Sequence, residues 1–431
     1  MSVPSSNNSP VKHPSERPLP PFPVDNSQDS SSSPYAATTL TSRAAVDKDS
    51  NYGSVMPPLY LSSNYTFDGF KGKRQYDYSR SGNPTRDAVG QAIADLEGGA
   101  GAVLTASGMG ALDLLFHYVR PGELIFAPHD CYGGTYRLLR YKADFGFYRV
   151  RFLDMTDLAG LALALAEEAP KLLLLESPSN PLLRLTDIRA ACELAKTYGV
   201  LCAVDNTFMS PVLQQPLSLG ADIVIHSTTK YLNGHGDVVG GALVSKNKEL
   251  HDHFTWWGNC IGNTGAPFDS YMTLRGMRTL ELRVRQQEDS AREIAELLNQ
   301  HPAITKVYYP GLVDHPEHRL ACRQQNGFGA MISFELAGGE PELIQFLDQL
   351  KLFSLAESLG GIESLVAHPA TMTHVAMAPK ARAEAGISDQ LLRLSIGLEA
   401  VRDLKQDLQN ALNTVSPEQK IEQEERPLSL A

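Results

Sequence analysis

The stretch LCAVDNTFMSPVLQQPLSLGADIVIHSTTK, which spans residues 201–230, decides the fold. It contains two short apolar runs, residues 201–204 and 223–225, which we interpret as buried strands joined by a connection of helix length. Asp205 directly follows the first run, and Lys230 lies just beyond the second. Because parallel strands end at the same edge of a sheet and ligands bind outside that edge, we expect a functional site there.

The same pattern continues on both sides of this stretch. Further apolar runs at residues 102–105, 124–127 and 171–175 predict strands, and helices are predicted at residues 111–119 and 186–198. Strands that alternate with helices in this way predict an α/β fold, with a mostly parallel sheet covered on both faces.

The pattern changes after about residue 285. A long helix is predicted at residues 283–300 and a strand at residues 330–335, which favours a smaller α+β domain at the C-terminal end. Residues 1–50 contain 12 Ser and 8 Pro and bury too little apolar surface to offset their ordering entropy, so we expect a disordered leader. The polar residues 416–431 are expected to form a flexible tail.

Charge and composition disfavour several classes of protein. The 431 residues include 38 Lys and Arg against 49 Asp and Glu, and the net charge of −11 argues against nucleic-acid or membrane partners. No apolar run reaches the roughly 20 residues of a membrane helix, and the leader lacks the apolar core of a secretion signal, so we expect a cytoplasmic protein. No CxxC spacing occurs among the five cysteines, and we expect no metal site. A nucleotide-binding enzyme is disfavoured because neither GxxxxGK[ST] nor GxGxxG after a strand is present.

Polar residues that follow the predicted strands are expected to meet in one crevice. Asn180 follows the run at residues 171–175, while Asp205 and Lys230 follow the two runs quoted first. The run at residues 102–105 is followed by ASGMG and then by a helix. An amide, a carboxylate, a lysine and a glycine-rich helix N-terminus together suit an aldehyde cofactor that has a ring nitrogen and a phosphate.

The charge of each group indicates its role. Lys230 is expected to form a Schiff base with the cofactor aldehyde, because burial favours the neutral amine that attacks it. Asp205 is expected to keep the ring nitrogen protonated, so that the ring accepts electrons from a carbanion. Tyr132, in the segment HDCYGG, is expected to stack on the ring.

The phosphate is expected to lie at the start of the predicted helix that follows ASGMG. The backbone amides of Gly108 and Met109 would bind it with the help of the helix dipole. The hydroxyl groups of Ser227 and Thr229 would add further donors.

Three longer segments resemble the Cys/Met-metabolism pyridoxal-phosphate enzymes, the trans-sulfuration family. They are YSRSGNPTR at residues 78–86, STTKYLNGHGDVVGG at residues 227–241 and VYYPGL at residues 307–312. The resemblance runs from about residue 52 to residue 412 and leaves only the two tails uncovered. It implies pyridoxal 5'-phosphate (PLP) as the cofactor, held as a Schiff base with Lys230.

The resemblance also implies a particular architecture. This is the fold-type I, aspartate-aminotransferase-like α/β fold of PLP-dependent transferases. Its parts are an N-terminal arm at residues 51–90, a cofactor-binding large domain at residues 91–285 and a small domain at residues 286–415. In the family the arm reaches a neighbouring subunit, so a homotetramer built as a dimer of dimers is expected.

Further site residues are implied by position within the family motifs. The arm residues Tyr78 and Arg80 match residues that reach the cofactor phosphate of the neighbouring subunit. Asn180 matches a residue that bonds the ring oxygen and the substrate carboxylate. Arg393, with Ser358 beside it, matches the clamp for the substrate α-carboxylate.

The resemblance also bears on the reaction. Glu357 matches a pattern of the γ-replacing and γ-eliminating members and would receive the ammonium group of L-cysteine, while Arg137 and Asn259 match residues near an activated homoserine ester. The expected reaction is replacement of the acyl group of O-succinyl-L-homoserine by L-cysteine, which yields L-cystathionine for methionine biosynthesis. Ser81 stands where a second arginine is common beside Arg80, which makes O-acetylhomoserine or a phosphate ester more plausible. Open alternatives are γ-elimination from L-cystathionine, sulfhydrylation of an O-acylhomoserine and a catalytically silent regulatory protein.

Overall fold

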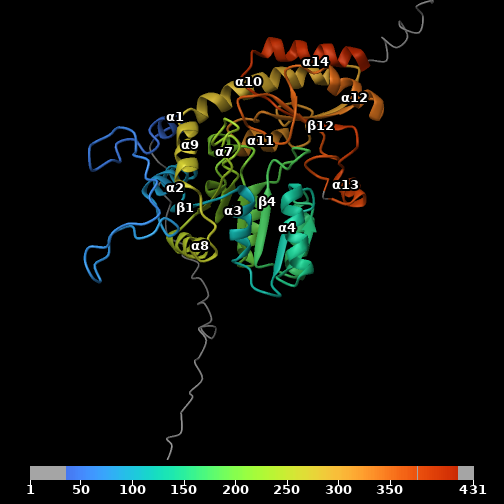
Figure 1. Ribbon diagram of the computed structural model, residues 1–431. Helices are drawn as coiled ribbons and strands as arrows, with labels where there is room; N and C mark the ends of the chain where they lie inside the picture. The colour runs from blue at the N-terminus through green and yellow to red at the C-terminus, as the bar shows by residue number, and fades with distance from the viewer. Residues whose placement is uncertain (1–34, 376, 416–431) are drawn as a thin grey trace, which may run out of the picture. The chain divides into compact units, whose positions relative to one another are not determined.

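Two β-sheets organise the part of the chain that the computed structural model describes, residues 35–375 and 377–415 (Figure 1). The predicted tail at residues 416–431 and most of the predicted leader, residues 1–34, lie outside the described residues. The larger sheet is built from residues 101–245 and the smaller from residues 304–395.

The larger sheet has seven strands in the spatial order β1-β7-β6-β5-β4-β2-β3. The strands are β1 (Gly101–Thr105), β2 (Leu124–Pro128), β3 (Arg149–Leu153), β4 (Leu172–Glu176), β5 (Leu201–Asp205), β6 (Ile223–His226) and β7 (Gly241–Ser245). Strand β7 runs antiparallel to both of its neighbours, and the other pairs are parallel. The predicted α/β fold with a mostly parallel sheet is therefore confirmed, and the five strands predicted in this region are all present.

Side chains of the central strands alternate between two apolar cores, one on each face of the sheet. In β4, Leu173 and Leu175 belong to the first core, whereas Leu172 and Leu174 belong to the second. This alternation follows from the two-residue repeat of a strand and explains why residues 172–175 are all apolar. Helices contribute to both cores. The first core includes residues of α2 (Pro84–Glu97), α5 (Leu158–Glu167), α6 (Ile188–Thr197) and α7 (Ser210–Leu213); the second includes residues of α3 (Gly108–Phe116), α4 (Gly133–Asp144) and α8 (Lys248–Ile261).

Strands β3 and β7 were not predicted from the sequence. Strand β3 lies at the edge of the sheet, and Arg149 and Arg151 alternate with its apolar residues, so it lacks the apolar run of a central strand. Strand β7 begins at Gly241 and follows a segment rich in glycine, which is typical of a loop.

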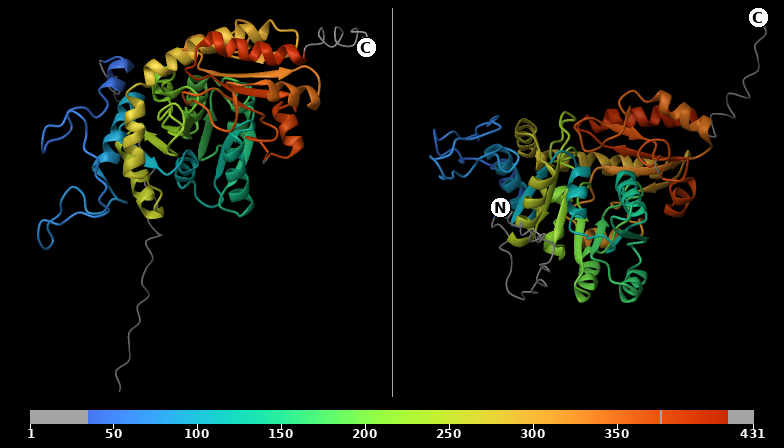
Figure 2. Two further views of the ribbon diagram at one scale, coloured as in Figure 1. Left: turned by 45° about the horizontal axis from the view of Figure 1, so that its top comes forward. Right: turned by 60° about the horizontal axis from the view of Figure 1, so that its bottom comes forward.

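The smaller sheet has five strands in the order β10-β11-β12-β9-β8. They are β8 (Ile304–Tyr308), β9 (Met331–Leu336), β10 (Ser354–Leu355), β11 (Leu365–Ala367) and β12 (Leu391–Ser395). The helices that follow the larger sheet and lie around the smaller one are α10 (Leu280–Asn299), α11 (His318–Gln324), α12 (Glu340–Gln349), α13 (Pro379–Ala385) and α14 (Val401–Val415), whereas α9 (Pro267–Met277) packs against α2. Helices α10 and α14 lie side by side in both Figure 1 and Figure 2. The long predicted helix is α10 and the predicted strand is β9, while the exact division into domains at residues 90 and 285 stays a prediction.

The prediction of disorder up to residue 50 is wrong for its last part. Residues Ala37–Ser42 form helix α1, which contacts α2 and α10, and Thr41, Ala44 and Ala45 are buried. The physical reason is uneven composition, because all 8 Pro of the leader precede residue 35. The small and apolar residues that follow can pack, although the average over the leader hides them.

Neither a membrane-spanning helix nor a cluster of metal-ligating side chains is found in the described residues. In the described ranges no helix is long and apolar enough to cross a bilayer, and the 20-residue helix α10 carries many charges. Within the same residues, no group of three or more His, Cys, Asp or Glu side chains is placed to hold a metal ion.

Candidate active site

A cavity of about 410 Å³ lies where strands β1, β4, β5 and β6 end, and residues from the smaller sheet complete its wall. The cavity brings together eleven of the residues predicted from the sequence: Gly108, Met109, Tyr132, Asn180, Asp205, Ser227, Thr229, Lys230, Glu357, Ser358 and Arg393. Its position agrees with the rule that ligands bind outside the carboxyl ends of parallel strands.

Lys230 places its amine inside this cavity. Its Nζ donates a hydrogen bond to Ser358 Oγ at 2.9 Å. Burial, with a further contribution from the charge of Arg393, lowers the pKa of Lys230 from 10.5 to about 8, although Glu357 opposes the shift. Ser358 has a φ of 105°, a backbone conformation that is unusual for serine and recurs at functional sites. A buried amine with this pKa is partly neutral near pH 7 to 8 and can attack an aldehyde or accept a proton.

Asp205 is the last residue of β5, and its carboxylate lies in the wall of the cavity. Its Oδ1 accepts a hydrogen bond from the backbone N–H of Thr207 at 3.0 Å. Burial raises the pKa of Asp205, while the bonds from Thr207 and the nearby His226 lower it. Among the described residues, no cationic side chain forms an ion pair with this largely buried carboxylate. A protonated ring nitrogen beside it would stabilise it, so this position fits the pyridine ring of PLP.

The N-terminus of helix α3 provides a place for a phosphate. Ser107 caps the helix, since its Oγ accepts the N–H of Gly110 at 3.0 Å, and the first amides of a helix have no intrahelical acceptor. A Cβ at Gly108 would lie 2.7 Å from the Cβ of Ser227, so only glycine leaves this cradle open. These residues fit the phosphate of PLP. The Thr229 hydroxyl donates to Gly240 O at 3.2 Å and accepts its N–H at 3.0 Å, which fixes the turn around the lysine.

Arg393, in strand β12, faces the cavity from the smaller sheet and is only 2% exposed. One terminal nitrogen donates to Asn180 Oδ1 at 2.8 Å and the other to Ser358 O at 3.0 Å. Its Nε has no hydrogen-bond partner among the described residues. Burial lowers the pKa of Arg393 to about 10, so the guanidinium is still charged at neutral pH. A buried guanidinium without an acidic partner suits a bound carboxylate.

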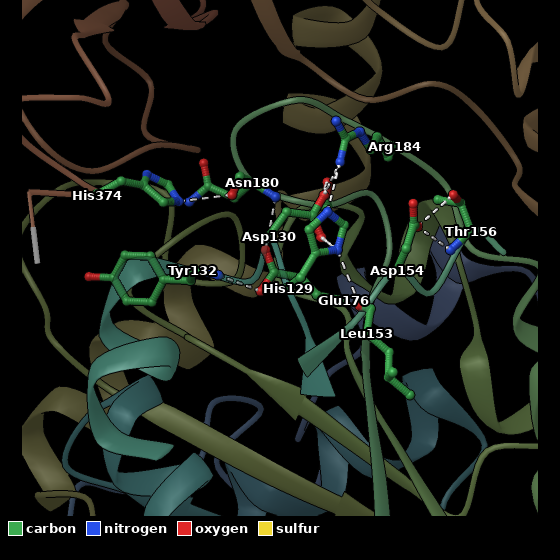
Figure 3. Close-up of polar contacts among 11 residues, drawn as sticks. His129, Asp130, Tyr132, Leu153, Asp154, Thr156, Glu176, Asn180, Arg184 and His374 are labelled. Carbon is green, nitrogen blue, oxygen red and sulfur yellow. Dashed lines mark hydrogen bonds and ion pairs between the residues drawn. The ribbon is translucent and has the colours of Figure 1, made fainter. Parts of the chain in front are cut away.

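Sequence reasoning missed Glu176, although the residue directly follows a predicted strand. The structure buries its side chain in the cavity wall, between the backbones of Tyr132 and Asn180 (Figure 3). Burial and the neighbouring Asp205 raise the pKa of Glu176 well above its ordinary value. The strand-end rule that identified Asn180 could have identified Glu176 as well.

His374 was missed too, and no motif in the sequence marks it. Its Nε2 donates to the carbonyl oxygen of Asn180 at 3.0 Å (Figure 3). Its Nδ1 accepts from Thr373 Oγ1 at 2.8 Å. Burial, together with the charge of Arg393, lowers the pKa of His374 to about 4, so the imidazole is neutral. His374 therefore fixes the backbone of Asn180 from the side of the smaller sheet.

Four predicted residues do not line the cavity of their own chain: Tyr78, Arg80, Arg137 and Asn259. Arg80 donates to Asn259 O at 2.7 Å and to Asn259 Oδ1 at 2.9 Å, and these two residues line a separate pocket of about 240 Å³. The Arg80 guanidinium lies 5.7 Å from the ring centre of Tyr78. Arg137, in helix α4, is close enough to Tyr132 to lower the pKa of that phenol, which burial and Glu357 raise.

Comparisons with known proteins agree with this geometry. A family model described as "Cys/Met metabolism PLP-dependent enzyme" matches residues 38–413. The chain is 54% identical over 379 residues to cystathionine gamma-synthase of Escherichia coli (strain K12), an alignment that covers 88% of this chain and 98% of the relative. It is 44% identical over 365 residues to a cystathionine beta-lyase of Coxiella burnetii, covering 84% and 93% of the two chains.

Two solved structures of one protein also resemble this chain over most of its length. Crystal structures of cystathionine gamma synthase from Xanthomonas oryzae pv. oryzae, in complex with aminoacrylate and cysteine and in complex with cystathionine, each superpose with a TM-score of 0.87 at 57% identity. The alignments cover 89% of this chain and 99% of that one. The cavity geometry and the match over most of the length lead to one conclusion: the chain belongs to the Cys/Met metabolism PLP-dependent enzymes.

Proposed function

We propose that the protein catalyses the reaction of a cystathionine γ-synthase, in which L-cysteine replaces the succinyl group of O-succinyl-L-homoserine. The products are L-cystathionine, a precursor in methionine biosynthesis, and succinate. The relatives at 54% and 57% identity support this reaction over the others of the family.

One geometric observation carries the proposal, the link from the lysine amine to the buried arginine through Ser358. The Ser358 Oγ accepts from Lys230 Nζ at 2.9 Å, and the Ser358 carbonyl accepts from Arg393 at 3.0 Å. An amino acid whose carboxylate pairs with Arg393 therefore has its α-carbon close to the amine of Lys230. This is the placement that removal of the α-proton requires.

The residues divide the work of the reaction. Bound PLP supplies an electron sink that stabilises negative charge at the α-carbon of the substrate. Asp205 keeps the ring nitrogen protonated, and Arg393 with Asn180 orients the substrate. Lys230 removes the proton from Cα and, once it has released that proton within the site, removes a proton from Cβ, so that the Cγ–O bond breaks and succinate leaves. The thiolate sulfur of L-cysteine then bonds to Cγ, and Lys230 returns the protons to Cβ and Cα.

The position of Glu357 supports a role in binding the second substrate. Its carboxylate lines the cavity, close enough to Lys230 and Tyr132 to shift the pKa of each. We assign it to the ammonium group of L-cysteine, which is the group that distinguishes this nucleophile from free sulfide. Arg137 and Asn259 are assigned to the homoserine ester.

The arm residues are part of the same proposal. Tyr78 and Arg80 do not line the cavity of their own chain, and we assign them to the cofactor phosphate of a second copy. The proposed assembly is a homotetramer made of two such dimers, and its proposed location is the cytoplasm.

A steady-state comparison tests the reaction. O-succinyl- and O-acetyl-L-homoserine are each supplied with L-cysteine and with sulfide, and the expected result is the highest kcat/KM for the succinyl ester with L-cysteine. A preference for sulfide would make the protein a sulfhydrylase. Rapid release of 2-oxobutanoate from L-cystathionine alone would make it a γ-lyase, and no turnover of any ester would leave a catalytically silent protein.

A further inference from the structure

The side chain of Glu176 joins two separate segments of the cavity wall. It is the last residue of β4, is 8% exposed and pairs in register with Asp205 on the neighbouring strand. One carboxylate oxygen accepts the backbone N–H of Tyr132 at 3.0 Å, and the other accepts the backbone N–H of Asn180 at 2.9 Å. Figure 3 shows both bonds converging on this one carboxylate.

Both partners of this carboxylate present working groups to the cavity. Tyr132 immediately precedes helix α4, and its ring lines the cavity where the cofactor ring would stack. Asn180 is held at three points, because Glu176 bonds its N–H, His374 its carbonyl at 3.0 Å and Arg393 its side-chain oxygen at 2.8 Å. The Glu176 bonds are the ones that connect the backbone of Tyr132 to the backbone of Asn180.

We propose that Glu176 is a positioning residue, whose single carboxylate sets the spacing between the Tyr132 ring and the Asn180 amide in the wall of the cavity that would hold the cofactor. It contacts no reacting atom in this role and acts through the two residues that it holds. The inference rests on the proposed function only for the choice of substrates.

The chemistry of a carboxylate explains why glutamate is suited to this position. An ionised carboxylate accepts hydrogen bonds and donates none, so each of its two oxygens can accept a backbone N–H. Glutamine has the same shape but one oxygen and one NH₂ group, so one of the two amides would face a donor and lose its partner. The ionised form is disfavoured by burial and by Asp205, whereas the bonds from Tyr132 and Asn180 favour it. A carboxylate that is kept at this position, although burial and Asp205 disfavour its charge, is consistent with a functional role.

The chain offers a matched control for the substitution Glu176→Gln. Asp407 in α14 is also a buried carboxylate, 6% exposed, and it accepts the backbone N–H groups of Lys351 and Leu352 at 2.9–3.1 Å. It does not line the cavity. Asp407→Asn therefore makes the same chemical change at a double-amide site remote from the cofactor.

The experiment compares both variants with the wild-type holoenzyme. The measurements are the melting temperature, the affinity of the apo-protein for PLP, the visible circular dichroism of the bound cofactor, and kcat and KM for the best substrate pair of the wild type. Both variants are expected to lose similar thermal stability. Only Glu176→Gln is expected to bind PLP roughly 10- to 100-fold more weakly, which is the worth of one lost charge-assisted bond, and to change the dichroism and kcat.

The outcomes separate cleanly. A Glu176→Gln enzyme with the PLP affinity, dichroism and kcat of Asp407→Asn overturns the proposal. If Glu176→Gln does not fold, Glu176→Asp takes its place, since the shorter side chain keeps the charge but cannot reach both amides. Unchanged cofactor affinity and kcat in Glu176→Asp also overturn it. The cofactor readouts do not depend on the substrate, so they remain valid even if the wild type prefers another ester or nucleophile.

Discussion

The buried amine of Lys230 leads to a quantitative prediction about how the apo-protein takes up its cofactor. Burial lowers the pKa of Lys230 from 10.5 to about 8. At about pH 7.5 the neutral fraction of an ordinary lysine is about 0.1%, and a pKa of about 8 raises it to about a quarter. Because only the neutral amine attacks the aldehyde, the structure predicts a rate of cofactor uptake roughly 200-fold above that of an unperturbed lysine at this pH, for equal access.

Stopped-flow absorbance gives the measurement. Apo-protein is mixed with PLP across a pH series, and the rate of appearance of bound cofactor is expected to rise about tenfold per pH unit below about pH 8 and to level off above it. The variant Glu357→Gln should move the midpoint downward, because the carboxylate of Glu357 raises the pKa of Lys230. Free Nα-acetyl-lysine, whose ε-amine is unmodified, is mixed with PLP as the reference with an unperturbed pKa. A rate that keeps rising tenfold per unit through pH 9 to 10 would refute the assignment of a desolvated amine.

Three further predictions concern other parts of the site. Arg393→Lys should lower kcat/KM roughly 10- to 100-fold with cofactor uptake unchanged, because an ammonium cannot bond Asn180 and the substrate carboxylate as a guanidinium does; steady-state kinetics measure this. His374 has a folded-state pKa of about 4 against 6.5 unfolded, so the wild type should lose up to about 3 kcal/mol of stability as the pH falls from 6.5 to 4. The variant His374→Gln should not show that loss when the free energy of unfolding is measured by urea titration at each pH. Equal pH dependence of the free energy of unfolding in wild type and variant would contradict the prediction. Inactive Arg80→Ala and Lys230→Ala proteins, unfolded and refolded together, should regain about a quarter of the activity if two copies share each site.

The sequence predicted the centre of the site better than its surroundings. Asp205 and Lys230 could be found because Asp205 ends one buried strand and Lys230 lies in the turn after another, and chain direction alone brings parallel strand ends together. Glu176 obeys the same rule, yet its function depends on which backbone amides lie within reach, and that is decided by how the loops before α4 and after β4 pack. His374 and Arg393 come from segments that follow the larger sheet by more than a hundred residues, where strand order gives no guidance. Arg393 was predicted only because a family motif marks it.

The same limit applied to the secondary structure. Central strands such as β4 can be predicted because they are apolar runs. The edge strand β3 alternates arginine with apolar residues and lacks such a run. In residues 1–50, the average composition combined a Pro-rich part with a part that contains helix α1, so the composition did not predict the helix. Apolar runs such as that of β4 depend on neighbouring residues and predict their strands, whereas β3 and α1 depend on packing partners that the sequence does not reveal.

Charge balance within the cavity supports the assignment of Arg80 to a second copy. The cationic side chains among the lining residues are Lys230 and Arg393. Lys230 is taken up in the bond to the cofactor aldehyde and so does not pair with the phosphate, and Arg393 is placed against Asn180 and Ser358, where a substrate carboxylate fits. The phosphate dianion would then be bound within one chain by backbone amides, hydroxyl groups and the dipole of helix α3. The N-terminus of a helix supplies only about half a positive charge. The exposed Arg80 guanidinium donates to the neutral Asn259 and forms no ion pair with the described residues, so its charge is free to complete that balance from the neighbouring copy.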